Sequence, residues 1–240
     1  GRGAGPPPNV ELRHLLDSVK GKGLAIQGAL GVKGGSLVYH LLFSNQGPAP
    51  LGGFAVQLNK NLLGITNQRP LEVDAHLGPL QPGANVLEVL PLTSSPEKVQ
   101  EGGSLSLQVA IKNTSGVFYF EDSILLTQCL LPGPPPMDPS EYPSRWGAKS
   151  PACQAVAQLP SATSPQSVQE RLAAANLTVL HKKRIESSGA DAMYCCGRLV
   201  TGEVLLCEVQ VLPQGGRCAV RSEKLTTSQL LATALQSVLS

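Results

Sequence analysis

The chain has 240 residues, of which 42% are hydrophobic, 15% charged and 4% aromatic, and its formal net charge is +2. This length suits one large domain or two domains of roughly 100 to 130 residues each. The small net charge argues against bulk electrostatic binding to nucleic acid or to a membrane surface, because such binding requires a strong basic excess. No apolar run approaches the roughly 20 residues that a membrane span needs.

Residues 1–18 are rich in glycine and proline, and this composition predicts the end of a flexible hinge. After them, hydrophobic residues alternate in short runs that are separated by Gly, Pro and Asn turns. The clearest runs are SLVYHLLFS, FAVQLN and SLSLQVAIK, and the first places four large side chains on one face: Leu37, Tyr39, Leu41 and Phe43. About seven such strands predict an antiparallel β-sandwich over residues 19–127.

The segment GVFYF, residues 116–120, holds three of the chain's nine aromatic residues. Alternation sends Phe118 and Phe120 to one face of a strand and Tyr119 to the other. The preceding NTSG suits a four-residue hairpin loop, and that register places Tyr119 opposite Ala110. We therefore expect the tyrosine ring on the solvent side of the sandwich, either as an ordinary exposed aromatic residue or as an anchor for a partner.

Six prolines between residues 131 and 144 end the strand pattern. The elements after them predict an α+β domain over residues 128–240, an antiparallel sheet with helices on one face. Ser164 and Pro165 fit the N-cap and the first position of a helix. We expect strands near residues 153–159, 177–185, 191–199, 203–212 and 217–221, and a last helix over residues 226–239.

The segment VTG connects two of these strands. A two-residue turn would force the β-branched Thr201 to positive φ, whereas a three-residue loop with Gly202 in the left-handed conformation does not. The resulting register places Tyr194 opposite Glu208 on the open face of the sheet. Trp146, the single tryptophan, lies in a polar stretch. We expect an exposed Trp and Tyr beside a carboxylate, a composition typical of peptide-binding hot spots; the alternative is a half-buried tryptophan that plugs a sheet edge.

The chain has one basic cluster, HKKR at residues 181–184. Such a run is commonly a solvated strand face. Alternation puts Lys182 and Arg184 together, and if they share the face of Tyr194 they can receive acidic residues of a ligand.

The six cysteines predict free thiols. Cys195 and Cys196 are adjacent and point to opposite faces of a strand, and the others lie in apolar runs, where a reduced cysteine behaves as a small hydrophobic residue. The sequence has no CxxC pair and no His-rich spacing, so we expect no metal and no cofactor. This use of cysteine predicts a reducing, cytoplasmic compartment. The four histidines are scattered and no nucleophile motif is present, so we expect no enzymatic activity.

Four segments resemble the appendage of the β-adaptins, large subunits of the heterotetrameric clathrin adaptor complexes: VKGKGLAIQG, FAVQLNKNLLG, LQVAIKNTSGVFYF and GADAMYCCGRLVTGEVLLCEVQV. The resemblance covers residues 19–240. It implies an immunoglobulin-like sandwich joined to an α+β platform at the end of a hinge. It also implies a non-catalytic scaffold for coated-vesicle formation, bound peripherally to clathrin-coated pits, vesicles or Golgi and endosomal membranes on their cytosolic face.

The resemblance implies clathrin as a partner, together with accessory and cargo-adaptor proteins that carry short helical or extended motifs. It implies only indirect contact with the membrane, and we expect no nucleic acid partner. Because the chain begins with Gly, we expect a fragment of a longer subunit, whose N-terminal trunk contacts the other adaptor-complex subunits. The hinge end has no clathrin box, since LRHLLD carries Arg13 and His14 where apolar residues are required.

Two peptide-binding sites are also implied by the resemblance. The platform site falls on Trp146 and Tyr194, with Arg184 and Glu208 as flanking charges. It accepts helical peptides with aromatic or leucine anchors, upstream acids and a downstream arginine. Where the family offers a second acid this chain has Gln154, which weakens the expectation of a ligand arginine. The sandwich site falls on four residues: Tyr119, Lys112, Gln57 and Asn59.

Two other classes of protein remain as alternatives. A secreted or cell-surface immunoglobulin-like adhesion module would oxidise its cysteines and carry glycans on the sequons at Asn113 or Asn176. A hydrolase or transferase would need a nucleophile and a base in one cleft, which the positions of the histidines do not indicate. A count of free thiols distinguishes the first alternative.

Overall fold

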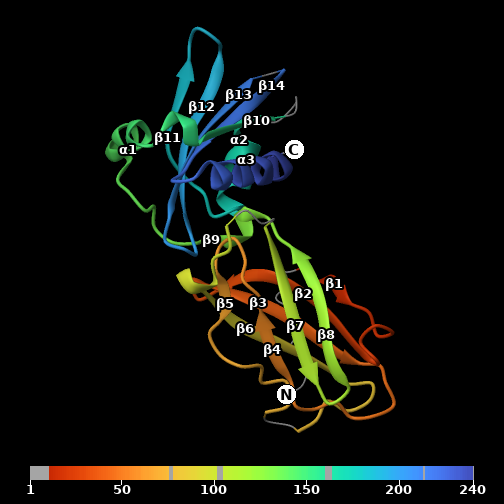
Figure 1. The fold of residues 1–240 in the computed structure, drawn as a ribbon. Coiled ribbons are helices and arrows are strands. Elements are labelled where there is room, and N and C mark those ends of the chain that lie inside the picture. Colours follow the sequence, from red (N-terminus) through yellow and green to blue (C-terminus); the bar gives the residue numbers. More distant parts are fainter. Residues whose placement is uncertain (1–10, 76–77, 102–104, 160–163, 213, 240) are drawn as a thin grey trace. The chain divides into compact units, whose positions relative to one another are not determined.

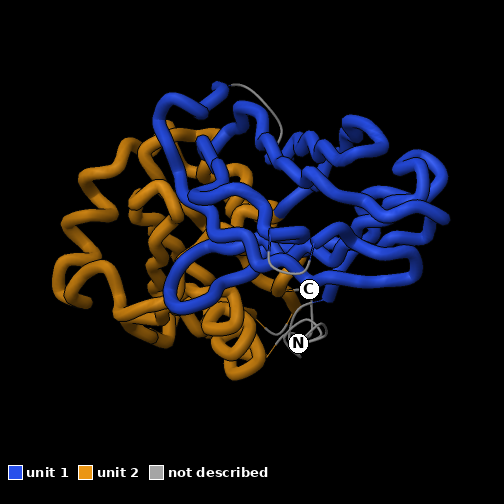
Figure 2. Tube along the Cα trace, turned by 90° about the horizontal axis from the view of Figure 1, so that it is seen from below, with its two compact units in different colours: residues 1–124 blue, residues 125–240 orange. Residues whose placement is uncertain are grey.

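The computed structural model describes residues 11–75, 78–101, 105–159, 164–212 and 214–239. The chain divides into two compact units, residues 1–124 and residues 125–240, which we call the sandwich unit and the platform unit (Figure 2). The boundary expected from the sequence, after residue 127, lies close to this division. Of the hinge end expected over residues 1–18, residues 1–10 lie outside the described residues.

The sandwich unit contains eight antiparallel strands within its described residues, arranged in two sheets (Figure 1). One sheet has the strand order β1-β2-β3-β6-β5 and the other has the order β4-β7-β8. The strands are β1 (Arg13–Leu16), β2 (Leu24–Lys33), β3 (Ser36–Asn45), β4 (Ala55–Leu58), β5 (Ile65–Asn67), β6 (Asn85–Ser94), β7 (Ser106–Asn113) and β8 (Gly116–Ser123), and a 3-10 helix covers Pro96–Lys98. The predicted all-β sandwich is confirmed.

The core of the sandwich unit follows the predicted alternation. The four large side chains of β3 that were expected on one face are each at most 1% exposed. The ring of Phe43 meets Phe54 edge-on, with the ring centroids 5.5 Å apart. From the other sheet, β7 contributes Leu107, Val109 and Ile111, which are also at most 1% exposed. Burial of each such side chain is worth about 1.5–3 kcal/mol, so these residues fix which face of each sheet turns inward.

Residues 13–16 belong to the sandwich, which corrects their assignment to a flexible hinge. They form β1, which pairs with β2. The Arg13 guanidinium lies 2.7 Å from the Asp122 carboxylate and donates a hydrogen bond to the Ser123 carbonyl. Asp122 is 3% exposed and also accepts a hydrogen bond from the Tyr39 hydroxyl at 2.8 Å. Ser123 lies 110 residues further along the chain, so local composition does not reveal this attachment.

Replacing Arg13 by Gln should lower the free energy of unfolding by about 2 kcal/mol, because it leaves the buried Asp122 carboxylate without its cationic partner. Urea unfolding measures this loss. Lys20→Gln is the matched control, since Lys20 is exposed and its ion pair with Asp17 spans 3.8 Å. The control should change stability by less than about 0.5 kcal/mol. Equal effects of the two changes would show that β1 does not support the sandwich.

The platform unit holds a six-stranded antiparallel sheet with the order β10-β14-β13-β12-β11 and with β9 paired to β12. Helices α2 and α3 lie on one face of this sheet and the shorter α1 lies on the other (Figure 1). The strands are β9 (Leu130–Leu131), β10 (Gln154–Leu159), β11 (Thr178–Ile185), β12 (Ala190–Leu199), β13 (Val204–Leu212) and β14 (Gly215–Arg221); the helices are α1 (Tyr142–Ala148), α2 (Pro165–Ala174) and α3 (Leu225–Leu239), with 3-10 turns over Leu126–Cys129, Pro139–Glu141 and Pro151–Cys153. The predicted α+β class is confirmed, whereas α1 was not predicted. No helix in the described ranges is long and apolar enough to cross a membrane.

Two local signals in the sequence act as predicted in the platform unit. The Ser164 hydroxyl caps α2 by accepting a hydrogen bond from the Ser167 amide at 3.1 Å. Gly202 has a φ of 90°, the left-handed conformation that the three-residue turn requires. This turn sets Tyr194 opposite Glu208. The sheet face that α2 and α3 cover is apolar, and seven of its residues are at most 5% exposed: Met193, Cys195, Leu199, Leu205, Cys207, Val209 and Val211.

All six cysteines are free thiols, and five of them are buried. Burial raises the pKa of Cys129 and of Cys218 to about 12. Burial raises the pKa of Cys196 to about 11. Because the thiolate is the reactive form, these thiols are protected both by their protonation and by the surrounding protein.

Alkylation of the native protein should modify Cys153 first, because it is partly exposed while the other five cysteines are buried. Iodoacetamide labelling followed by mass spectrometry measures the order of modification. Cys153→Ser should remove the fast phase, and denaturant should make all six sites reactive. Fast labelling of Cys196 in the native protein would contradict the packing of α1 over the open face of the sheet.

Candidate functional site

The platform pocket depends on α1, which lies over the open face of the sheet. Tyr142, the first residue of α1, is 6% exposed, and its hydroxyl donates a hydrogen bond to the Cys207 carbonyl at 2.9 Å. Its ring packs with three other buried side chains: Met137, Cys196 and Leu206. These contacts attach the helix to the middle of the sheet, and the next helical turn then presents Trp146 on the same face.

Four rings form a row on the open face, which we call the aromatic row: His181, Tyr194, Tyr142 and Trp146. The rings of His181 and Tyr194 are stacked with their centroids 6.1 Å apart, and Tyr142 meets Tyr194 edge-on at 5.5 Å. Tyr142 and Trp146 stack at 5.7 Å. Stacked and edge-on pairs at these distances contribute roughly 0.5–1.5 kcal/mol each beyond area burial. The row therefore holds its rings in place in the absence of a ligand.

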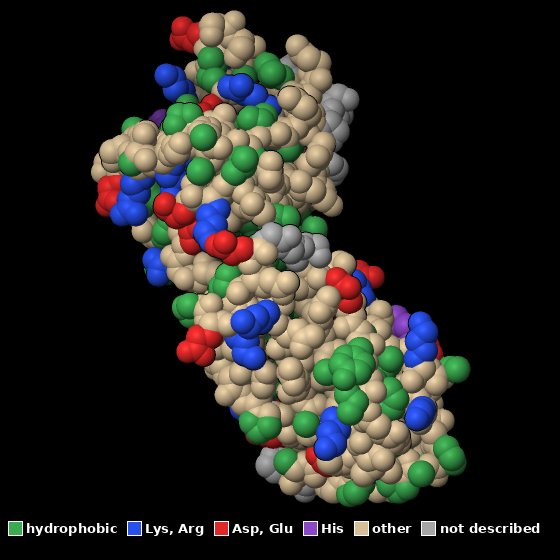
Figure 3. Space-filling view, in the orientation of Figure 1, with side chains coloured by type: hydrophobic (Ala, Val, Ile, Leu, Met, Phe, Trp, Pro, Cys, Tyr) green, Lys and Arg blue, Asp and Glu red, His purple; other side chains and the backbone are tan. Residues whose placement is uncertain are grey.

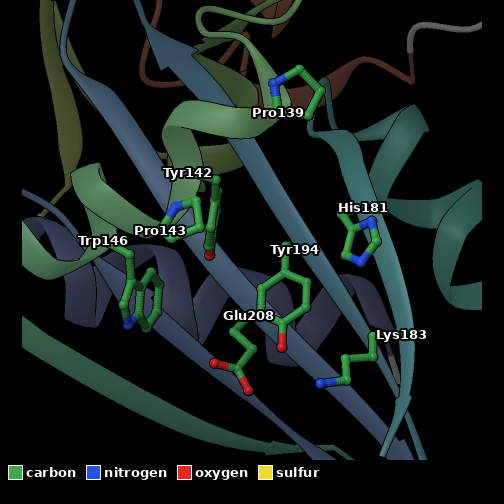
Figure 4. Close-up of a pocket in the computed structure, with 8 residues that line it drawn as sticks. All are labelled: Pro139, Tyr142, Pro143, Trp146, His181, Lys183, Tyr194 and Glu208. Carbon is green, nitrogen blue, oxygen red and sulfur yellow. The ribbon is translucent and has the colours of Figure 1, made fainter.

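A cavity of about 410 Å³ lies along this row, lined by Pro139, Tyr142, Pro143, Trp146, His181, Lys183, Tyr194 and Glu208. Figure 4 shows the α1 rings on one side, His181 and Lys183 of β11 on the other, and Tyr194 and Glu208 between them. Most of the lining is ring and proline surface, with a few polar groups among it. This combination is typical of a pocket that binds a ligand.

Besides the Glu208 carboxylate and the Lys183 ammonium, the polar groups of the lining residues are the His181 imidazole, the Trp146 indole N–H and two phenol hydroxyls. The Glu208 carboxylate accepts a hydrogen bond from the Gln210 amide, and the Lys183 ammonium extends toward Tyr194 (Figure 4). Burial, followed by the neighbouring Glu208 charge, raises the pKa of Tyr194. Burial also raises the pKa of Tyr142. Both phenols therefore stay neutral, and the cavity offers single charges around an apolar centre, which suits an amphipathic segment.

Trp146 is half-buried. The sequence favoured an exposed side chain here, with a half-buried tryptophan as the alternative. The guanidinium carbon of Arg221 lies 4.5 Å from the centroid of the Trp146 ring, a cation–π distance. Arg221 also donates hydrogen bonds to the Trp146 carbonyl at 2.8 Å and to the Gln154 side-chain oxygen at 2.9 Å. Gln154 lies outside the described lining of the cavity, and its contact is with the arginine that holds the tryptophan.

Arg184 is not among the residues that line the cavity, which corrects the place beside Tyr194 that the resemblance implied for it. The pairing of β11 with β12 contains a register shift just before His181. After this bulge His181 and Lys183 line the cavity, while Lys182 is hydrogen-bonded to α2 on the opposite face. Arg184 shares that opposite face and lies 3.3 Å from Asp191. A bulge of this kind re-aims side chains without a clear mark in the sequence.

The second candidate surface is the outward face of the β4-β7-β8 sheet. Tyr119 is 73% exposed and lies opposite Ala110, as the hairpin register predicts. Ala110 pairs in turn with Gln57, whose amide donates a hydrogen bond to the Asn59 side chain at 3.4 Å. Lys112 is exposed on the same face. Figure 3 shows hydrophobic side chains gathered over β7 and β8 in this region.

Sequence reasoning missed several residues of the two surfaces. Tyr142 was not predicted as a site residue because it lies in the proline-rich stretch, where no helix was expected. His181 and Lys183 were missed because the unrecognised bulge turns them, rather than Lys182 and Arg184, to the face of Tyr194. Val117, which is 49% exposed beside Tyr119, follows from the same alternation and could have been identified with it.

Replacing Tyr119 by Ala should change the free energy of unfolding by less than about 1 kcal/mol, because the ring is mostly exposed. Replacing Tyr142 by Ala should cost about 3 kcal/mol or more, because it removes a buried ring together with its hydrogen bond to the Cys207 carbonyl. Chemical denaturation followed by circular dichroism compares the two variants. The reverse order would show that Tyr119 is part of the core.

The sequence comparisons agree with this architecture. Residues 134–239 match the family model described as the β2-adaptin appendage, C-terminal sub-domain, a range that contains all the residues lining the cavity. The chain is 28% identical over 204 residues to the AP-1 complex subunit beta-1 of Homo sapiens, which covers 85% of the chain and 21% of that protein. It is 29% identical over 201 residues to the same subunit of Mus musculus, covering 82% of the chain and 20% of that protein. The chain thus spans about a fifth of the length of these relatives. With a sandwich unit and a platform unit of the expected classes, the chain is similar to the β-adaptin appendages, and the match to the family model covers its platform unit.

Proposed function

We propose that this appendage recruits clathrin and accessory or cargo-adaptor proteins during coated-vesicle formation by binding short peptide motifs, without catalysing a reaction. The proposal rests on the aromatic row and its cavity, which provide a preformed apolar pocket on the open face of the platform. The family match supports an adaptor role for the chain. The names of the relatives identify them as β subunits of the AP-1 complex.

A short amphipathic helix fits the chemistry of the platform pocket. Aromatic or leucine side chains spaced one helical turn apart can enter between the rings of Trp146 and Tyr194, as in helix-in-groove recognition. Lys183 and Glu208 then lie beside polar residues of the helix. Because such an interface is small, we expect an affinity near micromolar, on the order of −8 kcal/mol. Useful recruitment in a coat follows when many copies act together.

The surface around Tyr119 supports a second contact in the same proposal. Its ring stands over a small alanine on a flat sheet face, with exposed amide and ammonium side chains nearby. A flat surface of this kind suits an extended segment that lays one apolar side chain beside the tyrosine. We propose that Gln57, Asn59 and Lys112 contact the polar backbone and side chains of such a segment.

The same proposal places the chain on the cytosolic face of clathrin-coated pits, vesicles or Golgi and endosomal membranes. It reaches the membrane indirectly, as one part of a β subunit whose other parts contact the remaining adaptor subunits. Free, buried thiols agree with a reducing compartment.

Trp146→Ala and Tyr194→Ala should each weaken the binding of a helical peptide by about thirtyfold, or about 2 kcal/mol, because each removes a rigid anchor from the centre of the interface. Isothermal titration calorimetry with a synthetic peptide carrying Phe and Leu one helical turn apart measures this loss. Arg184→Gln is the control, because Arg184 lies on the opposite face of the sheet and should leave affinity unchanged.

A pull-down from cytosol extends this test to the natural partners. Clathrin detected by antibody should be retained by the wild type and lost, at least in part, with Trp146→Ala. A thermal melt of each variant shows that the fold is intact. Equal clathrin retention and equal peptide affinity in wild type and Trp146→Ala would overturn the proposal for the platform site.

A further inference from the structure

The side of the platform pocket next to β14 is positively charged. In the paired strands Arg221 lies opposite Leu206 and Arg217 lies opposite Gln210. Glu208 lies between those two β13 positions, so the two arginines flank it on the open face of the sheet. We call Arg217 and Arg221 the β14 flank.

Arg221 is fixed in its position by three contacts. Its guanidinium carbon lies 4.5 Å from the Trp146 ring centroid, and its two hydrogen bonds go to the Trp146 carbonyl and the Gln154 amide oxygen at 2.8 and 2.9 Å. Both acceptors are neutral groups. They orient the guanidinium, which carries five N–H donors in a rigid fork, and neither acceptor neutralises its positive charge. An arginine ordered in this way is preorganised for a carboxylate.

The one acid among the described residues that line the cavity is Glu208, and its side-chain hydrogen bond comes from a neutral amide. Glu208 accepts a hydrogen bond from the Gln210 amide, and the Gln210 oxygen accepts one from Arg217 at 3.0 Å. Lys183 adds another cation at the opposite end of the cavity. Among the described residues of the cavity lining and the β14 flank, three cations therefore surround a single carboxylate.

We propose that the β14 flank selects a carboxylate, so that the peptide continues past Trp146 with an acidic residue rather than with the arginine that the family resemblance implies. The preference for a carboxylate arises from the neutral Gln154. An acid at that position would compensate the positive charge of Arg221 and would favour a cation in the ligand. A ligand arginine would instead meet the like charge of Arg221. This inference rests on the proposed function, since it requires a helical peptide in the pocket.

The test uses three synthetic peptides with the same two anchors and with Glu, Gln or Arg one helical turn beyond the last anchor. A second set carries the same three residues one turn before the first anchor. Calorimetry with the wild-type chain should give the order Glu tighter than Gln, and Gln tighter than Arg, in each set, with steps of about threefold to fivefold for rim charges. The steps should shrink as salt is added, because exposed charges are screened.

Variants assign each preference to a residue of the chain. One peptide set should lose its preference for Glu when Arg221 is replaced by Gln. The other set should lose its preference for Glu when Lys183 is replaced by Gln. Gln154→Glu should reduce or reverse the preference that depends on Arg221, because it supplies the missing negative charge beside the guanidinium. Since Arg221→Gln also frees Trp146, the ratio between the peptides is the readout rather than the absolute affinity. Arg217→Gln, which does not contact the tryptophan, should reduce the same ratio by a smaller factor.

The outcomes separate this inference from the proposed function. If no peptide of either set binds the wild type, the proposed function and the inference both fail. If the peptides bind through Trp146 and the Arg forms are as tight as the Glu forms or tighter, only the inference fails. It also fails if Gln154→Glu leaves every ratio unchanged. The expected order, together with its loss in Arg221→Gln and in Gln154→Glu, supports it.

Discussion

The platform site depends on the attachment of Tyr142 to the sheet. Its hydroxyl reaches the Cys207 carbonyl of a central strand at 2.9 Å, and its ring separates those of Tyr194 and Trp146. Without this contact a helix of seven residues would have little to hold it, because isolated helices of that length are unstable in water. One buried phenol thus fixes the helix, and the helix brings the single tryptophan to the open face.

Arg221 completes this arrangement on the same face of the sheet, from the neighbouring strand β14. A tryptophan on a short surface helix has many possible orientations, and the cation–π contact together with the bond to the Trp146 carbonyl restricts them. Order established before binding lowers the entropy that a ligand must overcome. The same arginine also sets the charge at the edge of the pocket. The orientation of the tryptophan and the charge at the edge of the pocket therefore depend on the same residue, and Gln154 contacts that residue through one hydrogen bond.

Much of the fold could be predicted from the sequence, because its signals are local. The alternation in β3 and β7 and the left-handed Gly202 each determine a register from a few neighbouring residues. Those registers also gave the exposed Tyr119 and the pairing of Tyr194 with Glu208. The errors arose where the partners of a residue lie far away in the sequence, or where a β-bulge does not alter the pattern of polar and apolar residues. Arg13 finds its partners more than a hundred residues away, and the bulge before His181 reverses the faces of a uniformly polar run.

The two surfaces differ in how their tyrosines are supported, and this difference has consequences for selectivity. The ring of Tyr194 is held between His181 and Tyr142, so a ligand meets a formed pocket with charges in set positions. The ring of Tyr119 is 73% exposed over Ala110, so a ligand that covers it would restrict a mostly solvated side chain. A preformed pocket discriminates between ligands by shape and charge, whereas a free ring on a flat sheet accepts any segment that covers it. Under the proposed function, the platform unit would then determine which helical motif binds, and the sandwich unit would add a weaker contact that many sequences can make.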